Sequence, residues 1–156
     1  MSSGTEKVLY SFRASASDGT TAYSGLTDVK GTLYGTTFLS GAYGYGTVFS
    51  ITTGGKEKVV HSFGNGTDGK GPQAGLTDVG GTLYGTTIAG GSNCGTNGCG
   101  TAFKITTSGT ENVRHSFGMG TDGISPYARL IDVSGLYGTT YKGGTSGYGT
   151  VFSIAL

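Results

Sequence analysis

The clearest candidates for chemistry are three aspartates that recur at the same place in three similar stretches of the chain. Asp18, Asp68 and Asp122 each precede a glycine in a short polar loop. Carboxylate and loop carbonyl oxygens are ligands of Ca²⁺, so these loops are candidate calcium sites. Asp-Gly is equally the pattern of an ordinary turn, in which the aspartate caps its own backbone. No second carboxylate is seen to recur beside them, so paired acid–base catalysis is not predicted.

Two histidines and two cysteines are the other reactive side chains. His61 and His115 occupy the position where the first stretch has Tyr10, which indicates packing and a hydrogen bond, and we predict no metal site. Cys94 and Cys99 lie in one Gly-rich loop, "NCGTNGC". We expect a disulfide between them if the protein is exported, and free thiols otherwise.

Aromatic and amide side chains in the variable loops are candidates for ligand binding. Tyrosines beside Gly, Asn and Thr can stack on sugar rings and bond to their hydroxyls. The alternative is that the rings cover glycine backbone or make packing contacts. The candidate residues are Tyr43, Tyr45, Asn93, Tyr127 and Tyr148.

Catalysis and several partner classes are not predicted. No Ser–His–Asp arrangement can be picked out, and no glycine-rich phrase precedes a helix as a phosphate loop does. We therefore expect no catalytic residues and no cofactor. Charged residues make up only 12% of the chain and the net charge is +1, which argues against nucleic acid as a partner. No apolar run approaches the ~18 residues of a membrane helix, so no membrane partner is expected.

Three repeats must position these side chains. They span residues 6–56, 57–110 and 111–156 of a single repeat domain, and open with "EKVLYSF", "EKVVHSF" and "ENVRHSF". Short β-branched and aromatic runs bounded by Gly predict four strands per repeat, in the order "LTDV", "LYGTT", "VFSIT" and "EKVVHSF".

The phrase "LYGTT" is predicted to be the second strand of each repeat. Its leucines, Leu33, Leu83 and Leu136, are expected to face the core. Its glycine is expected to let the neighbouring sheet approach.

Three four-stranded repeats fit a β-propeller or a β-trefoil. The chain opens with a fourth strand, residues 6–12, and ends on a third strand, which favours the propeller. That N-terminal strand would complete the last blade of a partner or of the same chain. Three blades are too few for a ring. We therefore expect a homodimer with six blades, or alternatively a homotrimer with nine.

The phrases "GLTDVGGTLYGTTIAGG", "GTAFKITTSGT" and "HSFG" resemble the GloVer (Gloeobacter/Verrucomicrobia) tandem repeat of bacterial proteins over essentially the whole chain. The repeat is also similar, more loosely, to NHL-type propeller blades. The third repeat departs from the pattern by losing the Thr before "LYGTT". The resemblance implies an exported propeller, and it implies almost nothing about chemistry.

We therefore expect an all-β, non-catalytic repeat scaffold or binding module in an extracytoplasmic location. It would be a fragment or an engineered piece of a longer array, with a glycan or protein ligand on its loop face. The alternative is a carbohydrate-binding lectin that uses the same face.

Overall fold

The computed structural model describes residues 4–156, which form antiparallel β-sheets and a single short 3₁₀ turn, η1 (Gly95–Asn97). None of the helical structure in these residues is long and apolar enough to cross a membrane. The all-β prediction is therefore confirmed.

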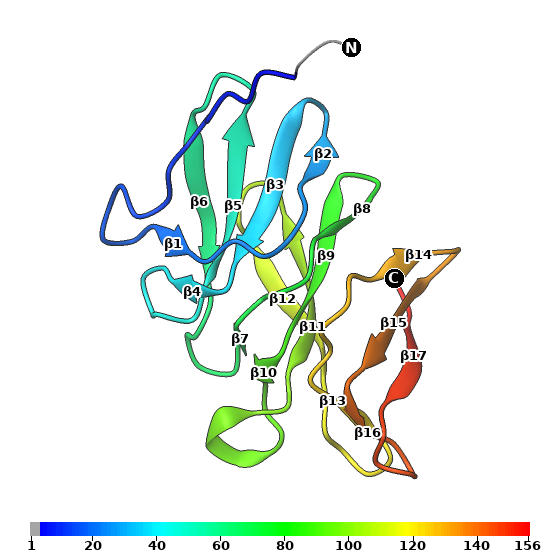
Figure 1. The fold of residues 1–156 in the computed structure, drawn as a ribbon. Coiled ribbons are helices and arrows are strands. Elements are labelled where there is room, and N and C mark those ends of the chain that lie inside the picture. The colour runs from blue at the N-terminus through cyan, green and yellow to red at the C-terminus, as the bar shows by residue number, and fades with distance from the viewer. Residues whose placement is uncertain (1–3) are drawn as a thin grey trace.

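Two four-stranded sheets have their strands in chain order, as the sequence predicted (Figure 1). Each takes three strands from one repeat and its fourth strand from the start of the next repeat. In both sheets a register shift occurs where the third strand pairs with the fourth. The first sheet contains β2 (Thr27–Val29), β3 (Thr32–Thr37), β5 (Thr47–Thr52) and β6 (Glu57–Ser62). The second sheet contains β8 (Thr77–Val79), β9 (Thr82–Thr87), β11 (Thr101–Thr106) and β12 (Glu111–Ser116).

The third sheet has three strands, and β17 is its edge. In the first two sheets, the third strand (β5 or β11) pairs with a fourth strand (β6 or β12). The equivalent edge of β17 has no paired strand among residues 4–156. Residues 6–12, the predicted fourth strand, form no strand here, and the Phe12 ring lies 5.0 Å from Phe49 of the first sheet. The third sheet contains β14 (Ile131–Asp132), β15 (Leu136–Thr140) and β17 (Thr150–Ile154).

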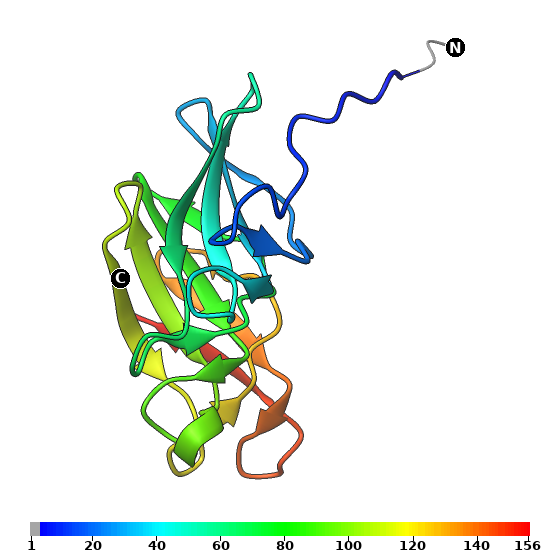
Figure 2. The ribbon, with the colours of Figure 1, turned by 90° about the vertical axis from the view of Figure 1, so that its left-hand side faces the viewer.

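Three two-stranded ladders tie the Asp-Gly loops to the variable loops. They lie on the side of the molecule away from the β2–β3 and β8–β9 hairpins (Figures 1 and 2). The pairs are β1 (Gly19–Thr20) with β4 (Leu39–Ser40), β7 (Gly69–Lys70) with β10 (Ala89–Gly90), and β13 (Gly123–Ile124) with β16 (Lys142–Gly143).

Apolar cores fill the two junctions between successive sheets. At the first junction, Tyr34 and Val48 of the first sheet pack with Leu83 and Phe103 of the second. At the second junction, Tyr84 packs with the third repeat's leucines. The sheets of residues 4–156 close neither into a barrel nor into a ring, so the barrel that a β-trefoil requires is absent from this part of the chain.

The glycine of "LYGTT" makes room within its own sheet. Gly85 pairs with Phe103, and a Cβ on Gly85 would lie 2.6 Å from that ring and 2.9 Å from Leu76 of the same repeat. The expectation that this glycine admits the neighbouring sheet was therefore wrong, because the space is filled by the aromatic ring on the paired strand. Leu83 and Leu136 are buried as predicted, whereas Leu33 is only partly buried.

Within residues 4–156, no neighbouring sheet covers the outer faces of the first and third sheets, and we call these two faces bare. The N-terminal segment lies on part of the first, where Phe12 packs against Phe49. Tyr34 and Tyr84 are 7% and 8% exposed, but the equivalent Tyr137 is 41% exposed. Val48 is fully buried, but the equivalent Val151 is 82% exposed. Apolar side chains that form a junction inside the molecule thus lie in solvent at its ends, which is an unusual use of apolar surface.

Candidate functional site

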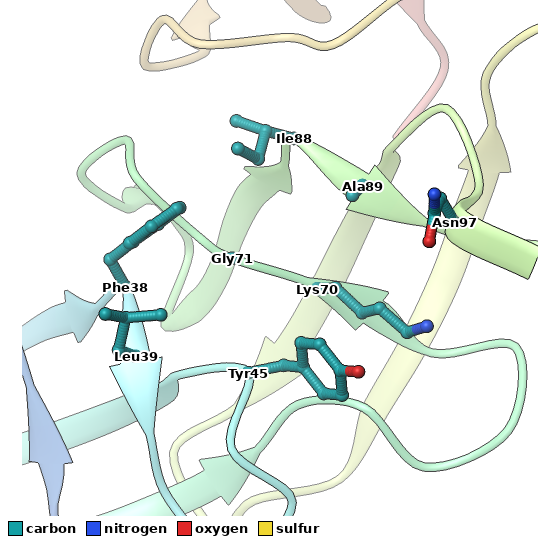
Figure 3. Close-up of a pocket in the computed structure, with 8 residues that line it drawn as sticks. All are labelled: Phe38, Leu39, Tyr45, Lys70, Gly71, Ile88, Ala89 and Asn97. Atoms are coloured by element: carbon teal, nitrogen blue, oxygen red, sulfur yellow. The ribbon is translucent and has the colours of Figure 1, made fainter.

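A small pocket opens on the loop side between the first two repeats (Figure 3). Its volume is about 180 Å³, and Phe38 and Ile88 give it apolar walls. The Lys70 ammonium lies 4.8 Å from the centre of the Tyr45 ring and donates to the carbonyl of Thr96 at 3.3 Å. The pocket thus combines an aromatic face and a cation, which suits a small polar ligand such as a sugar hydroxyl cluster.

The structure separates the predicted ligand-binding residues. Of these, Tyr45 lines the pocket in Figure 3, while Asn93 donates its amide to the carbonyl of Ser116 at 2.7 Å. Tyr127 packs edge-on against Tyr141 in a separate hollow beside β15. The other two predicted residues, Tyr43 and Tyr148, are exposed and line neither hollow.

Sequence reasoning missed two contributors to the pocket, Lys70 and Asn97. Lys70 sits one residue after the Asp-Gly pair, in the two-residue strand β7 that pairs with β10. The signal that could have revealed it is the lysine itself, because the other two repeats have Thr20 and Ile124 at this position.

Each of the three predicted aspartates accepts a hydrogen bond from a side chain in the segment that precedes its loop. Asp18 accepts from the Tyr10 hydroxyl at 2.8 Å. His61 Nε2 lies 3.0 Å from Asp68 Oδ2, and the corresponding His115–Asp122 distance is 2.7 Å. The hydrogen bond predicted for the histidines is therefore present. Calcium at these carboxylates stays a prediction, and backbone N–H groups compete for the same oxygens.

A glutamate from the next sheet approaches two of these aspartates. The ligand atoms of His61, Asp68 and Glu111 all lie within 4.8 Å of one another. Burial of Glu111 and the nearby Asp68 carboxylate raise the pKa of Glu111 to about 7, and His61 opposes this. The three residues come from β6, the Asp-Gly loop and the first residue of β12.

A cluster at the N-terminal end of the first sheet has the same arrangement, with Tyr10 in place of the histidine. Burial of Glu57 and the charge of Asp18 raise the pKa of Glu57, while a hydrogen bond with Tyr10 lowers it. The hydrogen bond to Asp18 raises the pKa of Tyr10 to about 12. The sequence signal for these clusters is the glutamate that opens "EKV", "EKV" and "ENV", namely Glu6, Glu57 and Glu111. Spacing along the chain does not reveal the cluster, because the glutamate and the aspartate belong to different repeats.

The third cluster is incomplete. His115 and Asp122 form their pair, but within residues 4–156 no carboxylate from a following fourth strand joins them. The missing strand of the third sheet is the one that would carry that carboxylate.

Cys94 and Cys99 form a disulfide in the loop that carries η1, with their Cα atoms 5.6 Å apart. Cys99 is buried beside Ala102 and Phe117, so the bridge anchors this longest variable loop to the second sheet. Asn97, which lines the pocket, lies between the two cysteines.

Comparisons with known proteins place the chain by its repeat. No curated protein and no solved structure gives a significant match. The Gloeobacter/Verrucomicrobia repeat matches residues 1–156, which is the full length of the sequence. The chain therefore belongs to the Gloeobacter/Verrucomicrobia repeat family.

Proposed function

We propose that this chain is a non-catalytic β-propeller scaffold whose three repeats are blades, and that two copies close head to tail into a six-bladed ring. Six blades lie within the usual propeller range, whereas the nine blades of a trimer exceed it. The loop side of the ring would carry the binding pockets, as variable loops on a rigid scaffold commonly do.

The observation that supports this proposal is the difference in burial between equivalent positions of the repeats. Val48 and Tyr34 are buried by the next sheet, whereas Val151 and Tyr137 face solvent. At the opposite end, Leu26 is exposed where Leu76 is fully buried. The two bare faces are the two halves of one junction, so each fits the other on a second copy.

The repeat also specifies how the free strand would pair. Within the chain, Ser50 pairs with Lys58 and Lys104 pairs with Asn112. The equivalent residues at the open end are Ser153 on β17 and Lys7 on the N-terminal segment. Lys7 of one copy would therefore lie opposite Ser153 of the other, and the ring would leave no open sheet edge.

A designed cross-link tests this register. The double variant Lys7→Cys with Ser153→Cys is expected to form a covalent dimer under mild oxidation, seen on a non-reducing gel. A mixture of the two single variants is expected to give one cross-link per pair of chains, whereas each single variant alone gives none. A cross-link confined to single chains, or equal cross-linking by one single variant alone, would contradict the head-to-tail arrangement.

Carbohydrate binding is a second candidate function, favoured by the Tyr45 ring and the Lys70 ammonium in one apolar pocket. A glycan array identifies the ligand, and titration calorimetry then compares wild type with Tyr45→Ala. We expect the variant to lose affinity by roughly fivefold or more, since a stacked aromatic contributes on the order of 1 kcal/mol or more. Tyr148→Ala is the matched control, because Tyr148 is exposed and lies outside the pocket. Absence of binding to every glycan would exclude this candidate.

We also infer that the protein works outside the cytoplasm, because its disulfide anchors a pocket loop and such bonds persist in oxidising compartments. Alkylation before reduction, followed by mass spectrometry of protein from its native host, tests this. Two alkylated thiols would contradict it.

A further inference from the structure

We propose that the junction between the first and second sheets is a binding site for a divalent transition-metal ion, with Zn²⁺ as its representative, held by His61, Asp68 and Glu111. Their ligand atoms lie within 4.8 Å of one another, and His61 Nε2 and Asp68 Oδ2 are 3.0 Å apart. An imidazole nitrogen with two carboxylates is a ligand set that zinc accepts, with a fourth position left for water.

A buried oxygen of Glu111 without a hydrogen-bond partner in the described part of the chain supports a bound cation at this junction. Glu111 Oε1 is buried and has no hydrogen-bond partner among residues 4–156. A buried carboxylate oxygen without a partner is costly, and a bound cation would offset that cost. Asp68 is itself only 8% exposed, so water has little access to the cluster from its side.

The ligands are oriented by the surrounding structure. The His61 ring packs edge-on against Phe63 with the ring centres 4.8 Å apart, and Asp68 Oδ1 accepts from the Gly69 N–H. Such outer contacts fix the direction of metal ligands. With zinc–ligand bonds of about 2.0–2.2 Å, tetrahedral donors lie roughly 3.3–3.6 Å apart. Bringing the donors from the present 4.8 Å limit to that spacing would need a shift of roughly 1.2–1.5 Å, which the flexible Glu111 side chain permits.

The cluster of Tyr10, Asp18 and Glu57 at the N-terminal end of the first sheet provides an internal control. It has Asp18 and Glu57 in the same roles, and Asp18 Oδ1 and Glu57 Oε1 are likewise buried without a hydrogen-bond partner among the described residues, but Tyr10 replaces the histidine. A neutral phenol offers no nitrogen donor and keeps its proton at neutral pH, so this cluster is not expected to hold zinc. The chain therefore contains both a competent cluster and a matched incompetent one.

The cluster of His115 and Asp122 would become competent to bind zinc only in the assembled ring, and this part of the inference rests on the proposed function. His115 and Asp122 are already paired at 2.7 Å. The position equivalent to Glu111 on the missing fourth strand is Glu6. Glu6 of a second copy would complete this site, so that the metal would bridge two chains.

Titration of chelator-treated protein with ZnCl₂ alone, followed by calorimetry, measures the number of sites. We expect two zinc ions per chain in the dimer, and one per chain for either Glu111→Gln or Glu6→Gln. Glu57→Gln is the matched control and is expected to keep both sites. Zinc should also raise the melting temperature of the wild type.

Exchange of histidine and tyrosine gives the sharpest test, because the chain already folds with either residue at this position. His61→Tyr is expected to lose one zinc ion per chain, and Tyr10→His is expected to gain one. A dimer that binds no zinc would overturn the metal site and leave the propeller proposal intact. A monomer that binds one zinc ion through Glu111 would support the site within the chain and overturn the role of Glu6.

Discussion

The junction between the first two sheets and the two bare end faces are built from the same repeat positions, yet one is closed and the others are open. Leu76 is fully buried in the junction, whereas Leu26 is exposed at the open end. The difference lies in whether a neighbouring sheet is present, and not in the residue type. Burial in this molecule is therefore a property of neighbouring repeats, as expected for repeat proteins.

One position separates the two kinds of face chemically. The Thr27 and Thr77 hydroxyls each donate to the carbonyl of a leucine in the next repeat. The third repeat has Ile131 there, and it is exposed. The open face thus lacks a hydroxyl and gains an apolar side chain, which favours a contact driven by apolar burial.

The largest expected effect is on the closed junction. Leu76→Ala should lower the free energy of unfolding by about 2–5 kcal/mol, because it leaves a cavity between two sheets. Leu26→Ala should change the unfolding of a separated chain by less than about 0.5 kcal/mol and weaken dimerisation instead. Urea unfolding at low and high protein concentration separates the two effects. Equal losses of stability from Leu76→Ala and Leu26→Ala at low protein concentration would contradict the difference between the closed junction and the open face.

The pH dependence of stability compares the cluster that contains Glu111 with the cluster that contains Glu57. The raised pKa of Glu111 means that the folded protein holds this proton more tightly than the unfolded chain does, so its contribution to stability is fullest at low pH. That contribution is lost as the pH rises from about 4.5, the ordinary value for glutamate, to about 7. Glu111→Gln should therefore stabilise the protein relative to wild type above pH 7 when a chelator is present.

Glu57→Gln should show the same sign, because the pKa of Glu57 is raised as well. Chemical unfolding of the three proteins between pH 4 and pH 8 measures both differences. If either Gln variant lost stability relative to wild type as the pH rose, the assigned burial of that carboxylate would be wrong.

An intermediate effect concerns the exposed face of the third sheet. Val151→Lys should leave the unfolding of a separated chain nearly unchanged, since this side chain is already in solvent. The same lysine would be buried in the dimer, so we expect dimer dissociation to rise by about 100-fold or more. Dilution followed by sedimentation velocity measures it. Val48→Lys, at the equivalent closed position, should instead prevent folding.

The smallest effect is expected at the disulfide loop. Replacing both Cys94 and Cys99 with Ser should cost at most about 2 kcal/mol, because the bridge closes a short loop. The dimer should persist, since the loop belongs to the loop side and not to either bare face. Thermal melts with light scattering check both points, and loss of the dimer would show that the loop takes part in assembly.

The strands and their order were predictable because β-branched runs, glycine turns and the repeat itself agree at each position. A hydrogen bond for the histidines was predictable because His61 and His115 stand where the first repeat has Tyr10, but the aspartate partner was not. The approach of Glu111 to Asp68 was not predictable, because it depends on how two sheets pack, which no local pattern encodes. The contact between Gly85 and the Phe103 ring was not predictable either, because it depends on the register of the two strands.

The mass of the wild-type protein in solution tests the central claim most directly. Size-exclusion chromatography with light scattering at micromolar concentration should give twice the 15.7 kDa of one chain. A mass of one chain that persists at high concentration would contradict the closed six-bladed ring.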